Sequence, residues 1–282
     1  MGNGLSNEKQ SPVGDTQRMF TTDSEIVLAA RCFRKTRLTQ VMLLLAIPIA
    51  LIAWAVAANL FDLDPIFASR AAMLTCAPFL IAAIFSPLLR RSPKEVRWRA
   101  YVVQWFIIAV VFNILWQMPP LVFRFVFEPL YGGGVDPTQV TMTYQIFWWG
   151  YHSADLDYGH LSRYWILAEL TWWIISALVI VALIKLRRGR EKVAFTLLGV
   201  CGALQLYNVL YFYGYGGIVG LESSGQIFDN IATDSPLATI LYWTYNSLWG
   251  IAALIASVLS FKCLFFINSK RTESSVHHEK SA

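Results

Sequence analysis

The sequence is short of charge. Only 15% of its 282 residues are Asp, Glu, Lys or Arg, whereas 56% are hydrophobic. A soluble domain has about 25% charged residues, so this chain has too few to cover a surface that faces water. Its four cysteines are too sparse for a disulfide-stapled scaffold, and its 15% of aromatic residues exclude an intrinsically disordered chain. These absences leave an integral membrane protein.

Several chemical signatures are also missing. There is no Walker or dinucleotide motif, and no DDxxD-type acidic cluster of the kind that holds magnesium and diphosphate in terpene synthases. His152 and His160 lie near Asp155 and Asp157, but we interpret them as solvated loop residues. We therefore expect no metal and no cofactor. The cysteines lack metal-site spacing: Cys32, Cys76, Cys201 and Cys263.

Long apolar runs are what the sequence has instead. A bilayer core of about 30 Å requires about 20 mostly apolar residues, and lipid forces such a segment to be helical. The sequence predicts an all-α integral membrane protein, a six-span helical bundle. Its spans are expected at residues 39–60, 70–89, 101–123, 165–185, 193–213 and 237–266.

Charge predicts the orientation of these spans. Lys and Arg collect before the first span, between spans 2 and 3, between spans 4 and 5, and after the sixth, whereas the other connections are mainly acidic. The positive-inside rule places the basic connections and both termini in the cytoplasm. These connections account for the net charge of +5, so we expect the lipid bilayer as a partner and no nucleic acid. The endoplasmic reticulum is the expected membrane.

Composition divides the chain into parts. We expect a polar cytoplasmic tail at 1–38, two additional transmembrane helices at 39–99, a four-helix bundle at 100–266 and a second cytoplasmic tail at 267–282. The long aromatic segment 124–164 is expected to lie over the bundle as a lumenal lid. Most polar groups at membrane depth lie in spans 3–6, which predicts an intramembrane pocket there.

Glu169 is the most informative residue. It lies about one turn into the fourth span, where a carboxylate costs about 2.5–3.5 kcal/mol or more unless it faces the protein interior. A buried neutral carboxylic acid can donate a proton, so we interpret Glu169 as a candidate general acid. The alternatives are a structural Glu bonded to a neighbouring helix and an interfacial Glu that reaches water.

Amides and aromatic rings accompany Glu169 in the four last spans. Any single amide is explained by hydrogen bonding between helices. Together, the groups predict an aromatic-walled pocket for a rigid apolar ligand such as a sterol, or for a carbocation, which ring faces stabilise. The candidates are the catalytic Asn113 and Gln117 and the substrate-binding Trp116, Trp172, Trp173, Tyr207, Asn208, Tyr211, Tyr242, Asn246 and Trp249.

Residues 100–266 resemble the emopamil-binding protein superfamily, or EXPERA fold. The resemblance implies a membrane bundle with a sterol-sized cavity, whose best-known activity is sterol Δ8–Δ7 isomerisation. It is carried by Trp105-Phe106, Ser162-Arg163-Tyr164, Glu169 within LAELTWW, Asn208-Val209-Leu210-Tyr211-Phe212 and Asn246-Ser247-Leu248-Trp249.

Departures from that family change the expected chemistry. The His and Glu that the isomerase uses correspond here to Asn113 and Gln117, and neither amide transfers protons at neutral pH. One acid in an aromatic cage still permits acid-triggered cyclisation, as in the similar membrane-bound terpene cyclases of fungal meroterpenoid pathways. We therefore expect an acid-initiated cyclase or isomerase of an apolar terpenoid. The alternatives are a non-catalytic sterol or lipid binder and a sterol isomerase.

Overall fold

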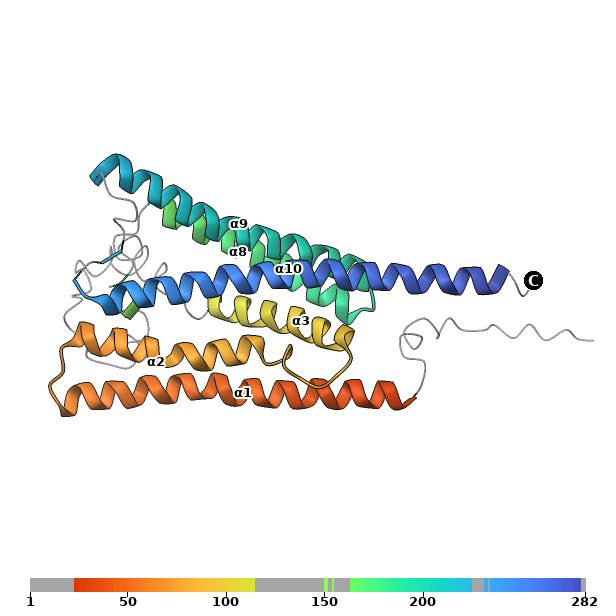
Figure 1. Ribbon diagram of the computed structural model, residues 1–282, viewed down its shortest axis with the longest axis horizontal. Coiled ribbons are helices and arrows are strands. Elements are labelled where there is room, and N and C mark those ends of the chain that lie inside the picture. The colour runs from red at the N-terminus through yellow and green to blue at the C-terminus, as the bar shows by residue number, and fades with distance from the viewer. Residues whose placement is uncertain are drawn as a thin grey trace, which may run out of the picture.

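The fold comes from a computed structural model, and in the residues that it describes the regular structure is helical, with no strand. The described backbone covers residues 23–114, 150–151, 154, 163–224, 231–232 and 234–279, and the described side chains cover 38–64, 66–114, 150–151, 154, 167–211, 231–232 and 234–268. The helices run along the long axis of the molecule (Figure 1). They are α1 (Asp23–Leu60), α2 (Pro65–Phe85), α3 (Lys94–Phe112), α8 (Arg163–Arg187), α9 (Glu191–Ser224) and α10 (Pro236–Glu279).

Among the described residues, five helices are long and apolar enough to cross a membrane, so the chain is an all-α integral membrane protein. They confirm five of the six predicted spans to within a few residues. The remaining predicted span, 101–123, is described only in part, because α3 ends at Phe112 and residues beyond 114 lie outside the described ranges. That span stays a prediction. The five are Leu38–Leu60, Ile66–Phe85, Leu167–Arg187, Glu191–Tyr211 and Pro236–Asn268.

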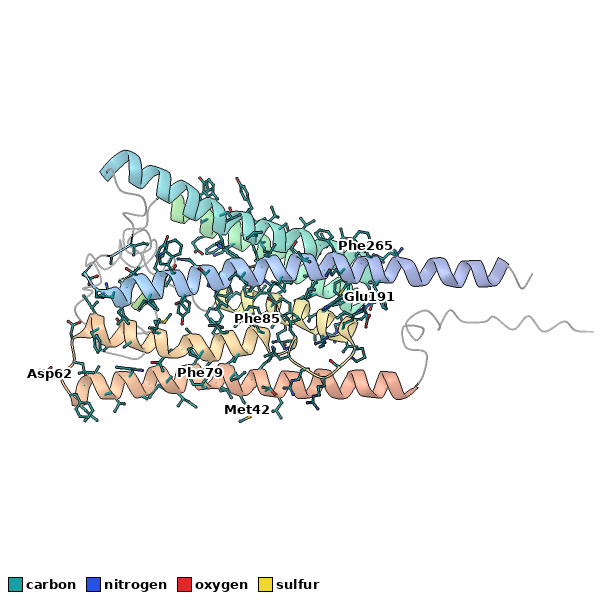
Figure 2. The ribbon with its side chains drawn as sticks, viewed as in Figure 1. Met42, Asp62, Phe79, Phe85, Glu191 and Phe265 are labelled. Carbon is teal, nitrogen blue, oxygen red and sulfur yellow. The ribbon has the colours of Figure 1, made fainter. Side chains whose placement is uncertain are left out.

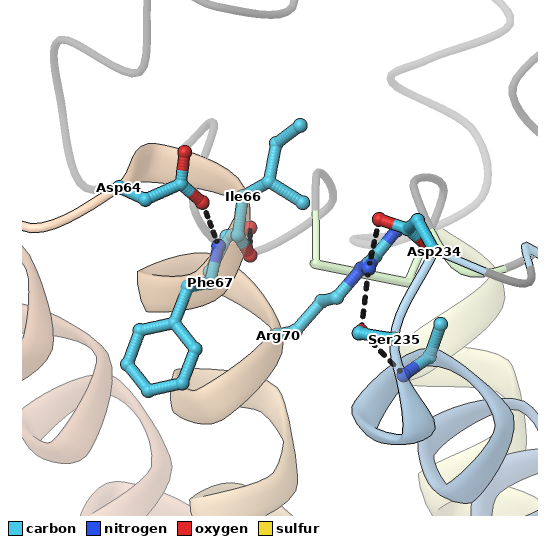
Figure 3. Close-up of polar contacts among 8 residues, drawn as sticks. Asp64, Ile66, Phe67, Arg70, Asp234 and Ser235 are labelled. Carbon is cyan, nitrogen blue, oxygen red and sulfur yellow. Dashed lines mark hydrogen bonds and ion pairs between the residues drawn. The ribbon is translucent and has the colours of Figure 1, made fainter.

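The second span begins and ends about one turn earlier than its hydropathy predicts. Asp64 caps the helix, because its side chain accepts a hydrogen bond of 2.7 Å from the backbone N–H of Phe67 (Figure 3). Pro65 follows at the first helical position, where its missing N–H costs nothing. Arg70, the first residue of the predicted span, consequently lies inside the helix, one turn after its beginning.

Helices α10 and α3 occupy the middle of the bundle. In Figure 1, α1 and α2 lie side by side on one flank, whereas α8 and α9 form the opposite flank. Helix α10 packs against α9, α3 and α2, and α8 packs against α9 and α3. Helix α1 is the least buried of the five candidate spans. Met42 on its outer face is 65% exposed and points away from the bundle, toward lipid (Figure 2).

Small residues bring α9 and α10 together. A Cβ atom added at Gly202 would lie 2.8 Å from the backbone nitrogen of Ser257 and 3.0 Å from the carbonyl oxygen of Ala253. The Ser257 hydroxyl donates a hydrogen bond of 2.8 Å to the carbonyl of Gly199. In lipid, close packing and such bonds replace the hydrophobic effect as the force between helices. This contact fixes α10 against α9.

Two ion pairs join distant segments at opposite ends of the bundle. Arg70 of α2, whose side chain is 4% exposed, contacts Asp234 at 2.7 Å and donates to Ser235 at 3.0 Å, just before α10 begins (Figure 3). Arg99 of α3 contacts Glu191 at the start of α9, at 3.1 Å. The pairs therefore connect α2 to α10 and α3 to α9.

The predicted tails are partly helical. Helix α1 begins at Asp23 and α10 continues to Glu279, so part of each tail extends a spanning helix. The beginning of α1 and the end of α10 lie at the same end of the bundle, as an even number of spans requires (Figure 1).

Little of the predicted lid, 124–164, is described. Gly150 is buried so closely against α2 that an added Cβ would lie 2.3 Å from the Ser69 carbonyl oxygen. Ala154 accepts a hydrogen bond of 3.0 Å from the backbone N–H of Ala232. This short piece therefore packs beside α2 and the segment that leads into α10.

Candidate functional site

Glu169 is wholly buried on the inner side of α8. It is 0% exposed, whereas its neighbours Leu167 and Leu170 are 52% and 48% exposed on the outer face of the same helix. A carboxyl group within an apolar span is costly unless protein surrounds it, and the burial of Glu169 satisfies that condition. The chain thus holds an acid that neither lipid nor water contacts.

The inner face of α8 continues beyond Glu169 at helical spacing. Trp172, Trp173 and Ser176 lie three, four and seven residues later, so they share its side of the helix. Trp172 and Ser176 are each 8% exposed. The indole N–H of Trp173 is buried and has no acceptor among the described atoms. A proton donor therefore lies one turn from the acid without a described partner.

Asn113 joins α3 to this face of α8. It lies in a π-type turn at the end of α3, a local widening that is frequent at functional sites. Its amide nitrogen donates to the Ser176 hydroxyl and, at 3.4 Å, to the carbonyl of Trp172. Asn113 is 5% exposed. The other two candidates of this span, Trp116 and Gln117, lie outside the described residues.

Two amides of α9 also make bonds between helices. Asn208 is 3% exposed and donates to the carbonyl of Ala168 on α8 at 3.1 Å. Gln205, one turn earlier, is 1% exposed and accepts from the indole N–H of Trp105 on α3 at 3.0 Å. Their three-residue spacing puts both amides on the inner face of α9.

These bonds place Glu169 where three helices meet. The residue before it, Ala168, is held by α9, and Trp172, one turn later, is held by α3. The backbone of α8 is therefore fixed on both sides of the acid.

Aromatic rings from α3 and α10 meet close to this junction. The ring of Trp249 lies 5.0 Å from that of Trp105 and 5.4 Å from that of Phe112, in tilted and edge-on geometry. Both distances lie within the range of favourable aromatic pairs. Because Trp105 also donates to Gln205, this ring cluster is tied to α9.

A second aromatic group surrounds Asn246 on α10. The hydroxyl of Tyr151 donates to Oδ1 of Asn246 at 2.8 Å, and the rings of Tyr151 and Tyr245 lie 6.0 Å apart. Tyr245 in turn donates to the carbonyl of Met73 on α2 at 2.8 Å. The amide nitrogen of Asn246 is buried without a described acceptor, so it has a hydrogen bond to offer a ligand. Tyr242, another candidate, is fully buried one turn earlier.

Tyr207 of α9 lies away from these groups. Tyr207 is 64% exposed, and its ring stacks on that of Tyr211 at 6.2 Å. Asn208 faces inward, and adjacent helical residues are about 100° apart around the helix axis, which turns Tyr207 toward lipid. Tyr207 is therefore not among the side chains at the helix junction.

Three contributors escaped the sequence analysis. Ser176 continues the stripe that begins at Glu169, so its spacing was a usable signal. Trp105 was noted only for the resemblance, and Tyr151 only as part of an aromatic stretch. Nothing local shows that Trp105 bonds to Gln205 or that Tyr151 bonds to Asn246, because each pair is separated by many residues.

The described side chains contain no group of three His, Cys, Asp or Glu residues able to hold a metal ion. His152 and His160 lie outside them. The aromatic-walled pocket itself stays a prediction.

Comparisons with known proteins add no neighbour. No protein-family model matches this chain, and no curated protein or solved structure matches it significantly. The resemblance to the emopamil-binding superfamily therefore stays a hypothesis, and the function has to be argued from the residues themselves.

Proposed function

We propose that this protein is a membrane-embedded, metal-independent terpene cyclase or isomerase. Its substrate is an apolar terpenoid, such as an epoxide-bearing prenyl chain of a meroterpenoid, that enters from the bilayer. Glu169 acts as the general acid. Trp172, Tyr211 and Trp249 stabilise the cation, and Asn113 acts with Gln117 to orient the acid or the epoxide oxygen.

The proposed reaction conserves all atoms. Glu169 gives its proton to an epoxide oxygen or an alkene carbon, and opening of the C–O bond or protonation of the double bond leaves a carbocation. A neighbouring alkene attacks this centre and closes a ring. The final cation loses a proton, which restores the acid directly or through an intervening group. The net change is an isomerisation, so no co-reactant is consumed.

The observation that carries the proposal is the complete burial of Glu169 within an apolar helix. A carboxyl group within a membrane helix carries a free-energy cost, and it is retained where protein contacts offset that cost or where it has a function. The neighbouring bonds of Asn113 and Asn208 hold α8 in place around it. The buried N–H groups of Trp173 and Asn246, which lack described acceptors, could bond to a substrate oxygen.

The decisive experiment replaces Glu169 by Gln and assays microsomes with a panel of epoxy-prenyl substrates. General acids contribute about 10²–10⁴-fold to rate, so E169Q should lose at least about 100-fold of product formation at unchanged protein level. E95Q is the matched control, because it makes the same chemical change in the first turn of α3, away from Glu169. This variant should keep full activity. E169D, which keeps an acid, should retain part of the activity.

Full activity of E169Q would refute the proposed mechanism. The second candidate function, a non-catalytic sterol or lipid binder, is favoured by one observation: the amide group of Asn113 donates two hydrogen bonds between helices, and that of Asn208 donates one. In the same membranes, saturable binding of a radiolabelled sterol with no cyclised or isomerised product would support that function.

A further inference from the structure

Two lysines lie over one tryptophan ring at the end of the bundle that is predicted to face the cytoplasm. This group is separate from Glu169. Lys94 begins α3, and Lys262 lies on α10. Both ammonium groups lie over the ring of Trp98, at 5.9 and 5.3 Å from its centroid. Cation–π attraction of this kind holds two like charges around one indole.

The charges around this indole are unbalanced. Both lysine side chains are exposed, and neither forms an ion pair within the described part of the chain. Among the described side chains, the carboxylates at this end are Glu95 and Glu191, and Glu191 is already paired with Arg99. Further positive charge comes from Arg90 and Arg91 in the connection that precedes α3, and from Arg97 in the first turn of α3.

Lys94, Trp98 and Lys262 lie at the level expected for the membrane surface. Lys262 lies near the end of the apolar part of α10, which runs from Pro236 to Asn268, and Trp98 lies just before the buried, apolar part of α3. Tryptophan concentrates at the interface, where its ring sits at the level of lipid headgroups. Basic clusters just cytoplasmic of spanning helices attract anionic headgroups.

We propose that Lys94, Trp98 and Lys262 form a binding site for the phosphate of an acidic phospholipid. The two ammonium groups bind the headgroup phosphate, and the indole holds both of them near one ring at the bilayer surface. The lipid bridges α3 and α10, the two central helices, and thereby steadies the bundle that holds Glu169. This site does not depend on the proposed catalytic function.

The test compares lipid retention by the full chain and a double variant. Protein is reconstituted in mixed phosphatidylcholine and phosphatidylserine, extracted in mild detergent and analysed by native mass spectrometry. The wild type should retain phosphatidylserine preferentially. K94Q/K262Q should bind it more weakly, by about fivefold for each lysine lost. K185Q/K192Q, which removes the same charge from the last turn of α8 and the first turn of α9, should retain it like the wild type.

Three further outcomes decide the proposal. K94R/K262R keeps both charges and should retain the lipid. This variant gives a result even if K94Q/K262Q fails to fold. Equal loss in K94Q/K262Q and K185Q/K192Q would overturn the site and indicate a general effect of surface charge. Stabilisation by inorganic phosphate without phosphatidylserine retention would identify a soluble anion in place of a lipid.

Discussion

At the scale of single residues, several buried polar groups in this protein pair with groups on another helix or on the segment that leads into it. Arg70 shows this most clearly, because a guanidinium with 4% of its side chain exposed requires partners, and it has Asp234 and Ser235. Asn113 and Asn208 follow the same rule with hydrogen bonds to α8. Glu169 lies among such residues, and its proposed acid chemistry relies on a site that these pairs keep rigid.

The first prediction at this scale concerns Asp234. In D234N the charge that balances Arg70 is lost, but Ser235 still accepts a hydrogen bond. Because Asp234 is 55% exposed, solvent weakens the pair, and we expect the free energy of unfolding to fall by roughly 1 kcal/mol. A lower thermal midpoint in detergent would show it. D62N, at an exposed residue with a φ of 49° that Asn tolerates, should leave the midpoint unchanged.

At the scale of helices, the arrangement depends on where small residues lie. Helices α9 and α10 pack closely because Gly202 leaves room for the backbone of Ser257. Gly250 lies on the same helix pair but has only an ordinary contact, 3.4 Å from Cγ1 of Val209 to an added Cβ. The two glycines are equally unfavourable for a helix, so what separates them is the space around them.

This difference predicts opposite results for one kind of substitution. G202A and G250A both gain helix propensity, by up to about 1 kcal/mol. Only G202A forces a new methyl group against backbone atoms, and overpacking costs about 1–3 kcal/mol. The midpoint of thermal unfolding in detergent should therefore be higher for G250A than for G202A. The midpoint of the wild type should be equal to that of G250A or slightly lower. Equal midpoints for the two variants would contradict the close packing of α9 against α10.

At the scale of the whole molecule, the bundle has a peripheral part and a central part. Helix α1 packs mainly against α2, whereas α10 contacts α9, α3 and α2. The described polar groups of the candidate site lie on α3, α8, α9 and α10, and at Tyr151. Helix α1 is consequently peripheral, whereas α2 reaches the central helices, for example through the Met73 carbonyl, which accepts a hydrogen bond from Tyr245.

The number of spans has a direct consequence for the two termini. The six predicted spans would place both of them on one side of the membrane, and the basic connections predict that this side is the cytoplasm. Tags at both ends should then be digested by protease added to the outside of sealed microsomal vesicles without detergent. Protection of one tag alone would contradict six spans, and protection of both would reverse the predicted orientation.

The sequence alone determined the class of protein and the position of five spans. Helices in lipid satisfy their own backbone hydrogen bonds, so about 20 apolar residues suffice to identify each one. It also singled out Glu169, because a carboxyl group in such a run is conspicuous. Capping by Asp64 moved only the limits of the second span.

The tertiary structure decided which side chains meet. That Tyr207 faces lipid while Asn208 binds α8, that Trp105 bonds to Gln205, and that Arg70 pairs with Asp234 depend on how helices far apart in sequence are rotated against one another. An apolar helix surface carries little information about that rotation, because lipid and protein interior are equally apolar. Small residues such as Gly202 and a few bonds between helices fix it.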